Sequence, residues 1–126
     1  MKDFRELKVW EKAHQLVLAV YQATAALPKE ELYGMTGQIR RSSVSIAANI
    51  AEGCGRGSDA DFGRFLQMAM GSASETEYHL LLCRDLGFLA DPVYESLRSN
   101  VEEVKRMMTG LLKTIRISSQ APMAES

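Results

Sequence analysis

The residues with the clearest chemical potential form a short glycine-rich stretch, Gly53-Cys54-Gly55-Arg56-Gly57. Backbone N–H groups at the start of a following helix, with an arginine beside them, could bind a phosphate. Dinucleotide-binding loops follow a β-strand, however, whereas this stretch follows a predicted helix and lacks a Gly-Lys-Ser/Thr sequence. We therefore favour a tight reversal of the chain that needs positive φ angles, and we expect no bound nucleotide or other small-molecule substrate.

Metal binding is the second chemistry to consider, because helical bundles can hold a pair of iron ions. Glu11 and His14 supply one Glu-x-x-His pair, whereas such a centre needs two pairs and two further carboxylates. The other histidine, His79, follows Glu75 at the wrong spacing. His14 also lies on a predicted apolar face, which favours a hydrogen-bonded structural histidine. The sequence therefore predicts no metal and no cofactor.

Nucleophilic catalysis has little support in the sequence. The chain has two histidines and two distant cysteines, and no Ser-His-Asp or Cys-His set is recognisable, although such partners can lie far apart in a sequence. We interpret Cys54 and Cys83 as small buried hydrophobic residues with reduced thiols. We predict that the protein is not an enzyme.

Arginines near the glycine-rich stretch could contact the phosphate groups of a nucleic acid; they are Arg40, Arg41, Arg56 and Arg64. The formal net charge is -1, so such binding needs a local patch rather than a general positive field. A structural interpretation is also open, in which Asn49 and Glu52 pair with an arginine such as Arg41 or Arg56 in a buried network that fixes the helix register. We favour that interpretation for Asn49 and Glu52 and leave the role of the arginines open.

Four segments with helical periodicity must position these residues. Apolar residues recur at three- and four-residue steps over residues 4–26, 35–54, 58–87 and 91–117. The predicted core stripes run through Leu7, Trp10, His14, Val17, Tyr21 and Thr24 in the first segment, through Met35, Ile39, Ser43, Ile46 and Ile50 in the second, and through Tyr94, Leu97, Val101, Val104, Met108, Leu111 and Ile115 in the fourth. Pro28 ends the first segment, Ser58 and Asp61 form a capping-box-like start for the third, and Pro92 suits the first turn of the fourth.

No segment alternates with the period of a strand, and the connections between the helices are short. The predicted fold class is all-α: a single-domain antiparallel up-and-down four-helix bundle at residues 1–117. The sequence then becomes polar and loses its period, which predicts a flexible polar tail at residues 118–126.

The start of the chain is charged rather than a secretory leader, and no apolar run is long enough to span a bilayer. We expect a cytoplasmic protein with no membrane contact.

The predicted third helix is apolar nearly all round, and a helix of this kind is usually buried on every side. Met68, Leu82 and Leu86 lie off its core stripe, as do Val9 and Leu16 on the first helix. One four-helix core takes only one face of each helix, so the surplus predicts a subunit interface. We expect the protein to be a homo-oligomer.

Three long stretches resemble one family: LKVWEKAHQLVLAVYQAT, LYGMTGQIRRSSVSIAANIAEGCGR and DFGRFLQMAMGSASETEYHL, the last followed by LGFL. They are similar to a bacterial four-helix-bundle family. It includes proteins encoded in intervening sequences of 23S rRNA genes and accessory proteins of diversity-generating retroelements. The resemblance covers about residues 4–89, and the fourth helix matches by its pattern alone.

The resemblance implies a bundle that assembles as a ring-like pentamer. The retroelement members resemble basic adaptors that bind a reverse transcriptase and nucleic acid, whereas this chain is slightly acidic. Two hypotheses follow. The first is a non-enzymatic oligomeric interaction module, and the alternative is a nucleic-acid or ribonucleoprotein accessory protein that uses the arginines.

Overall fold

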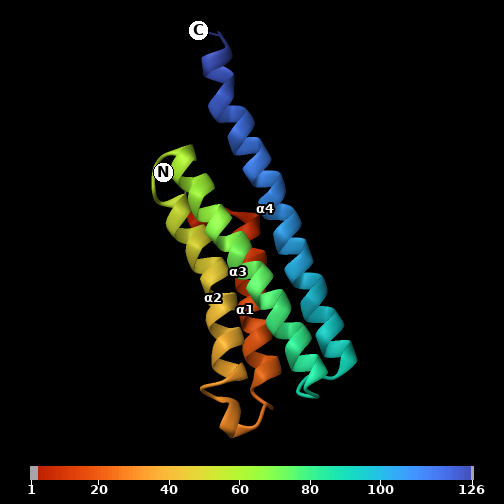
Figure 1. Cartoon of the computed structure of the whole chain (residues 1–126). Helices are drawn as coiled ribbons and strands as arrows, with labels where there is room; N and C mark the ends of the chain where they lie inside the picture. The colour runs from red at the N-terminus through yellow and green to blue at the C-terminus, as the bar shows by residue number, and fades with distance from the viewer. Residues whose placement is uncertain (1–2, 126) are drawn as a thin grey trace.

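The computed structural model describes the backbone of residues 3–125 and the side chains of residues 3–116. It contains four α-helices, with one short 3-10 helix before the first and another between the first and the second (Figure 1). The elements are η1 (Phe4–Glu6), α1 (Lys8–Thr24), η2 (Lys29–Glu31), α2 (Met35–Cys54), α3 (Asp59–Asp85) and α4 (Asp91–Glu125). No strand occurs in this part of the chain, and the prediction of an all-α four-helix bundle is confirmed.

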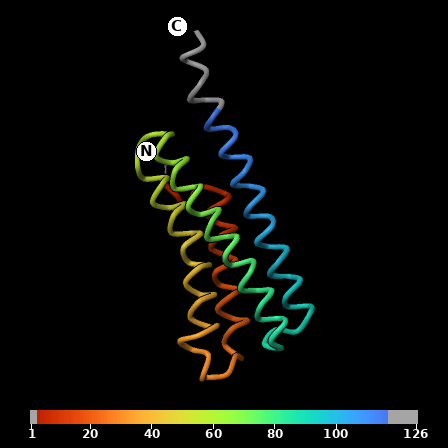
Figure 2. Tube along the Cα trace, viewed as in Figure 1, coloured from red at the N-terminus to blue at the C-terminus, as the bar shows by residue number. Residues whose placement is uncertain are grey.

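Successive helices run in opposite directions and lie side by side (Figure 2). Each helix contacts the next one along the chain, and α4 also contacts α1, so the helices occupy the corners of a square. The side formed by α2 and α3 therefore lies opposite the side formed by α1 and α4.

Local sequence signals account for most of the helix boundaries. The Ser58 hydroxyl accepts a hydrogen bond from the Asp61 backbone N–H at 3.2 Å, which is the predicted cap of α3. Gly87 follows α3 with a φ of 82°, and the Phe88 N–H donates to the Cys83 carbonyl oxygen at 2.8 Å. This is the glycine-terminated ending that satisfies the last carbonyls of a helix.

The first helix starts later than predicted. The Asp3 carboxylate accepts from the Arg5 backbone N–H at 2.9 Å and caps the 3-10 turn η1. Leu7, which follows η1, is extended. The regular helix consequently begins at Lys8 rather than at residue 4.

The core confirms the predicted stripes of α2 and α4 and corrects that of α1. Val9 and Leu16, which the sequence assigned to a subunit interface, are buried in the core, whereas His14 and Tyr21 are exposed. Small and branched side chains fill the interior of α1. The larger rings with polar atoms lie at its edge, where Trp10 stacks on His14 with ring centroids 4.9 Å apart. Val9 and Leu16 are therefore removed from the candidate interface.

The outer side of α3 agrees with the predicted apolar surplus. Met68 and Leu86 are exposed and Leu82 is half-buried.

Among the residues that the structure describes, none of the helices has the combined length and hydropathy needed to cross a bilayer. The tail predicted at residues 118–126 lies outside the residues with described side chains, so its flexibility stays a prediction.

Candidate functional site

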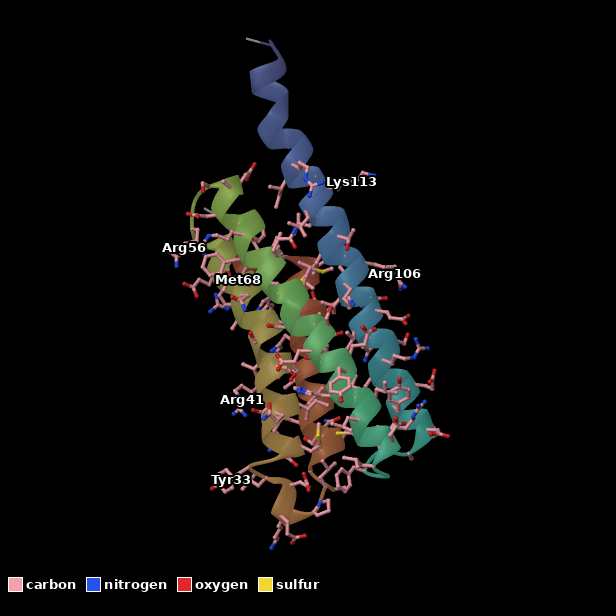
Figure 3. The ribbon with its side chains drawn as sticks, in the orientation of Figure 1. Tyr33, Arg41, Arg56, Met68, Arg106 and Lys113 are labelled. Carbon is pink, nitrogen blue, oxygen red and sulfur yellow. The ribbon has the colours of Figure 1, made fainter. Side chains whose placement is uncertain are left out.

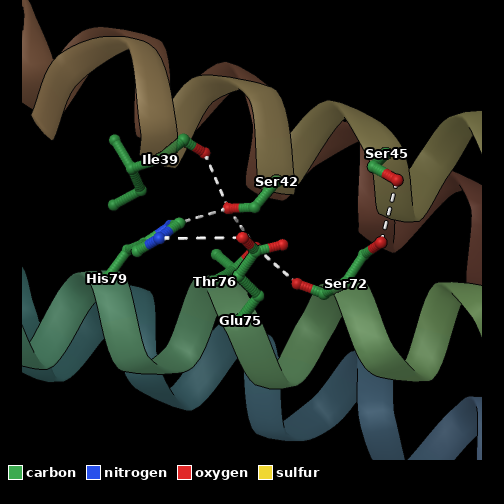
Figure 4. A network of polar contacts seen from close by, with 7 residues as sticks. All are labelled: Ile39, Ser42, Ser45, Ser72, Glu75, Thr76 and His79. Atoms are coloured by element: carbon green, nitrogen blue, oxygen red, sulfur yellow. Dashed lines mark hydrogen bonds and ion pairs between the residues drawn. The ribbon is translucent and has the colours of Figure 1, made fainter. Parts of the chain in front are cut away.

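The seam between α2 and α3 contains a buried polar cluster (Figure 4). Ser42 lies on α2, Thr76 and His79 lie on α3, and all three are buried. The Ser42 Oγ atom lies 3.1 Å from His79 Nδ1, and the Thr76 hydroxyl donates to Ser42 Oγ at 2.9 Å. We call Ser42, Thr76 and His79 the seam cluster.

The helical repeat positions these side chains. Residues three and four apart share one face of a helix, so Ser72, Thr76 and His79 form a row on α3 that faces α2. The Ser72 and Ser45 hydroxyls are 2.8 Å apart, which joins the two helices a second time. The Ser45–Ser72 and Ser42–Thr76 contacts each join two short hydroxyl side chains, which permit a close approach of the two helices.

The charge state of His79 follows from its surroundings. Burial lowers the pKa of His79, because the charged imidazolium loses its hydration. Glu75, whose carboxylate lies 3.9 Å from His79 Nε2, raises that pKa, and the nearby Arg41 guanidinium lowers it. The net pKa lies below the ordinary value of 6.5, so the imidazole is neutral at pH 7.

Ser42, His79 and Glu75 follow the order of a hydrolytic triad, but their burial is unsuited to catalysis. Ser42 is only 4% exposed, so a substrate carbonyl could reach its hydroxyl only if α2 and α3 separated. Cys83, one helical turn beyond His79, is also buried, and burial raises its pKa to about 11. A thiol with this pKa is protonated at neutral pH and is a poor nucleophile.

The buried network predicted for Asn49 and Glu52 with an arginine is not present at these residues. Glu52 is exposed and pairs with Arg56 on the surface at 2.7 Å. Asn49 is half-buried, and its Nδ2 donates to the Ser45 carbonyl oxygen at 2.9 Å instead of pairing with an arginine. The assignment of Glu52 to a buried network is therefore wrong, and the buried contacts belong to the seam cluster.

The four candidate arginines do not form one patch. Arg40 donates from Nε to the Thr24 hydroxyl at 2.9 Å and lies over the Tyr21 ring, so it joins α2 to α1. Arg41 is exposed and lies about four helical turns from Arg56. Figure 3 shows Arg41 toward the start of α2 and Arg56 near the turn that follows its end.

Arg56 and Arg64 do come together, at the turn between α2 and α3. Their guanidinium carbons lie 4.9 Å and 4.7 Å from the centroid of the Phe65 ring. Each also has a carboxylate partner: Glu52 at 2.7 Å from Arg56 and Asp61 at 3.7 Å from Arg64. Much of the positive charge needed to bind a polyanion is thus balanced locally.

The glycine-rich stretch reverses the chain, as the sequence indicated. Gly57 has a φ of 86°, which favours glycine. Gly53 is helical, and a side chain there would meet Phe65 on α3, so its role is close packing. Within the described residues, no three His, Cys, Asp or Glu side chains are grouped as metal ligands would be.

We expect Ser42→Ala to lower the free energy of unfolding by about 1 kcal/mol, the typical contribution of one intramolecular hydrogen bond. Glu52→Gln should change it by less than about 0.5 kcal/mol, because exposed ion pairs contribute little. Urea unfolding followed by circular dichroism compares the two variants at one protein concentration. A larger loss for Glu52→Gln than for Ser42→Ala would contradict the placement of both residues.

Comparisons with known proteins agree with this architecture. The model of the 23S rRNA-intervening sequence protein family matches residues 5–110. A crystal structure of a protein with unknown function from the S23 ribosomal protein family of Bacteroides thetaiotaomicron is 30% identical. The match covers 83% of this chain and 98% of that chain with a TM-score of 0.75. No significant match was found among curated proteins. With a fold of four helices and a family match over most of its length, the chain belongs to the 23S rRNA-intervening sequence protein family.

Proposed function

We propose that this chain is a non-enzymatic, cytoplasmic interaction module that works as a homo-oligomer. The observation that carries the proposal is the outer α2–α3 face, defined by four large apolar side chains between 40% and 58% exposed. They are Val44, Met68, Tyr78 and Leu86. Single exposed apolar residues are common, but several large ones on two neighbouring helices indicate an interaction surface.

The helical repeat brings the α3 members of this face together. Leu82 and Leu86 follow Met68 by about four and five turns of a helix, so the three residues lie along one line of α3. The charged residues of the face include both signs of charge, positive at Arg41 on α2 and negative at Glu75 on α3. A surface of mixed charge suits a second copy of the chain better than a strongly charged partner.

A second apolar surface lies on the opposite side of the square. A groove of about 430 Å³ runs between α1 and α4 and is lined by Ala19, Ala23, Val93 and Leu97, among others. Val93 is exposed, and we call this groove the outer α1–α4 face. A two-fold dimer uses one patch twice, whereas two different patches allow head-to-tail closure into a ring. The family resemblance implies a pentamer, and we propose that ring for this chain.

We expect the purified protein to have an oligomeric mass, pentameric for the proposed ring, by light scattering coupled to size exclusion. Met68→Glu should dissociate it, because an interface that buries an unpaired carboxylate is strongly destabilised. Ser99→Glu introduces the same charge at an exposed position of α4 and should leave the mass unchanged. A monomeric mass for the unmodified protein would refute the proposal, and a dimeric mass would refute only the ring.

A mixing experiment tests the head-to-tail pairing. Met68→Glu disables the outer α2–α3 face, and Val93→Glu disables the outer α1–α4 face. Each variant alone should be monomeric, but the mixture should form a dimer through the one pair of intact faces. Two monomer peaks after mixing would show that the two faces do not bind each other.

The nucleic-acid alternative has less support. Arg40 is engaged with α1, and the Arg56 and Arg64 pair is balanced by two carboxylates. An RNA-binding titration at low and high salt is the direct comparison, since phosphate contacts weaken steeply as salt rises.

A further inference from the structure

The seam cluster offers His79 Nδ1 a hydrogen-bond partner in both charge states of the ring. With a neutral ring, the Ser42 hydroxyl donates to His79 Nδ1 at 3.1 Å, and the Thr76 hydroxyl donates to Ser42 Oγ at 2.9 Å. In this arrangement Nε2 carries the ring hydrogen and points toward Glu75, 3.9 Å away. No buried side-chain polar atom among the described residues lacks a partner.

Reversing the direction of these bonds accommodates a protonated ring. His79 Nδ1–H would then donate to Ser42 Oγ, and the Ser42 hydroxyl would turn to the Ile39 carbonyl oxygen at 3.3 Å. The Thr76 hydroxyl has a second acceptor in the Ser72 carbonyl oxygen at 2.8 Å. The acceptors needed for both arrangements are already in place, so only hydroxyl hydrogens need to move (Figure 4).

We propose that His79, Ser42 and Thr76 form a proton-operated switch inside the α2–α3 seam. The neutral imidazole accepts from Ser42, and the imidazolium donates to it, while the bundle stays folded. The proton is taken up from solvent at Nδ1, which loses its role as an acceptor. This inference rests on the seam contacts and does not depend on the proposed assembly.

Two charged groups face the ring from the helices on either side of the seam. Glu75 on α3 lies near Nε2 and favours the imidazolium, whereas Arg41 on α2 opposes it. The Tyr78 ring lies 6.3 Å from the imidazole, and Cys83 remains a neutral thiol because its pKa is about 11. Protonation therefore turns the Glu75 contact into an ion pair at the border of the outer α2–α3 face.

The switch has a defined pH direction. Because the folded-state pKa of His79 lies below its ordinary value of 6.5, the unfolded chain binds more protons between those two values. The contribution of His79 to the free energy of unfolding is therefore fully present above pH 6.5 and is lost as the pH falls from 6.5 through the folded-state pKa. The imidazolium becomes populated in the folded state over the lower part of that window.

Nitrogen-15 NMR of the two imidazoles tests this inference in the full chain. We expect His79 to hold its hydrogen on Nε2 at pH 8. On acidification it should take up a proton with a midpoint below 6.5, while the backbone amide spectrum stays dispersed. His14 is exposed and remote from the seam in sequence, so its signal, assigned with His14→Gln, is the internal control.

Two variants separate the switch from simple burial. Ser42→Ala should lower the His79 midpoint further, because the buried Nδ1–H of the imidazolium loses its acceptor. Glu75→Gln removes an exposed carboxylate, should keep the fold, and should also lower the midpoint. The inference is overturned if His79 carries its hydrogen on Nδ1 at pH 8, or if protonation coincides with loss of the folded spectrum. Unchanged midpoints in both variants would overturn it as well.

Discussion

Leu16→Ala should lower the free energy of unfolding by about 2–5 kcal/mol, the usual range for truncating a fully buried leucine. Leu16 is 0% exposed in the core of the bundle. Its removal loses the apolar contacts of the side chain and leaves a cavity that the packed helices can only partly fill. This is the largest stability effect that we expect from one conservative substitution on α1.

Leu18→Ala is the matched control, because the same side chain on the same helix is 52% exposed. We expect a change within about 0.5 kcal/mol for it. Both substitutions should be made in the Met68→Glu background, so that assembly does not contribute to the measured stability. Urea unfolding followed by circular dichroism supplies the comparison. Equal losses of unfolding free energy at Leu16 and Leu18 would mean that α1 is rotated about its axis toward the buried face predicted from its sequence.

The buried face of α1 was predicted wrongly because of the composition of this helix. Apolar residues occur all round this helix, and two stripes satisfy the three- and four-residue rule. One passes through Trp10 and Tyr21, and the other passes through Val9 and Leu16. Helical periodicity alone cannot choose between them, because the choice depends on which neighbours the helix packs against.

The second helix shows the opposite case. Its bounds, Met35–Cys54, were predicted to the residue, and its buried stripe agrees with the expected one. A glycine precedes it, glycines close it, and a single isoleucine-rich face leaves no competing phase. Where local signals and periodicity agree, sequence reasoning is sufficient to place a helix.

The seam cluster could not be predicted from the sequence without knowing which helices pack together. Ser42 and His79 are separated by 37 positions in the chain, and only the pairing of α2 with α3 brings them together. By contrast, Glu52 and Arg56 stand four apart, and this spacing by itself accounts for a surface ion pair. The spacing of Ser72, Thr76 and His79 on one face of α3 was the available sequence signal for a polar seam.

Gly53→Ala should destabilise the protein by about 1–3 kcal/mol, as overpacking of a close helix contact usually does. A Cβ atom on Gly53 would lie 2.6 Å from Phe65 Cβ and 3.0 Å from Phe62 Cδ1. The Phe65 Cβ is attached to the backbone of α3, so the clash can be relieved only by moving the helices apart. That movement would also loosen the Arg56 contact with the Phe65 ring.

The control for this effect is Gly110→Ala, because nothing lies within 4 Å of a Cβ atom at that position. Alanine is favoured over glycine in a helix by about 1 kcal/mol, so this variant should be as stable as the parent protein or slightly more stable. Thermal unfolding of the two variants therefore separates a steric cost from the general preference of helices for alanine. If Gly53→Ala gained stability as Gly110→Ala should, the close approach of α2 and α3 at the glycine-rich turn would be refuted.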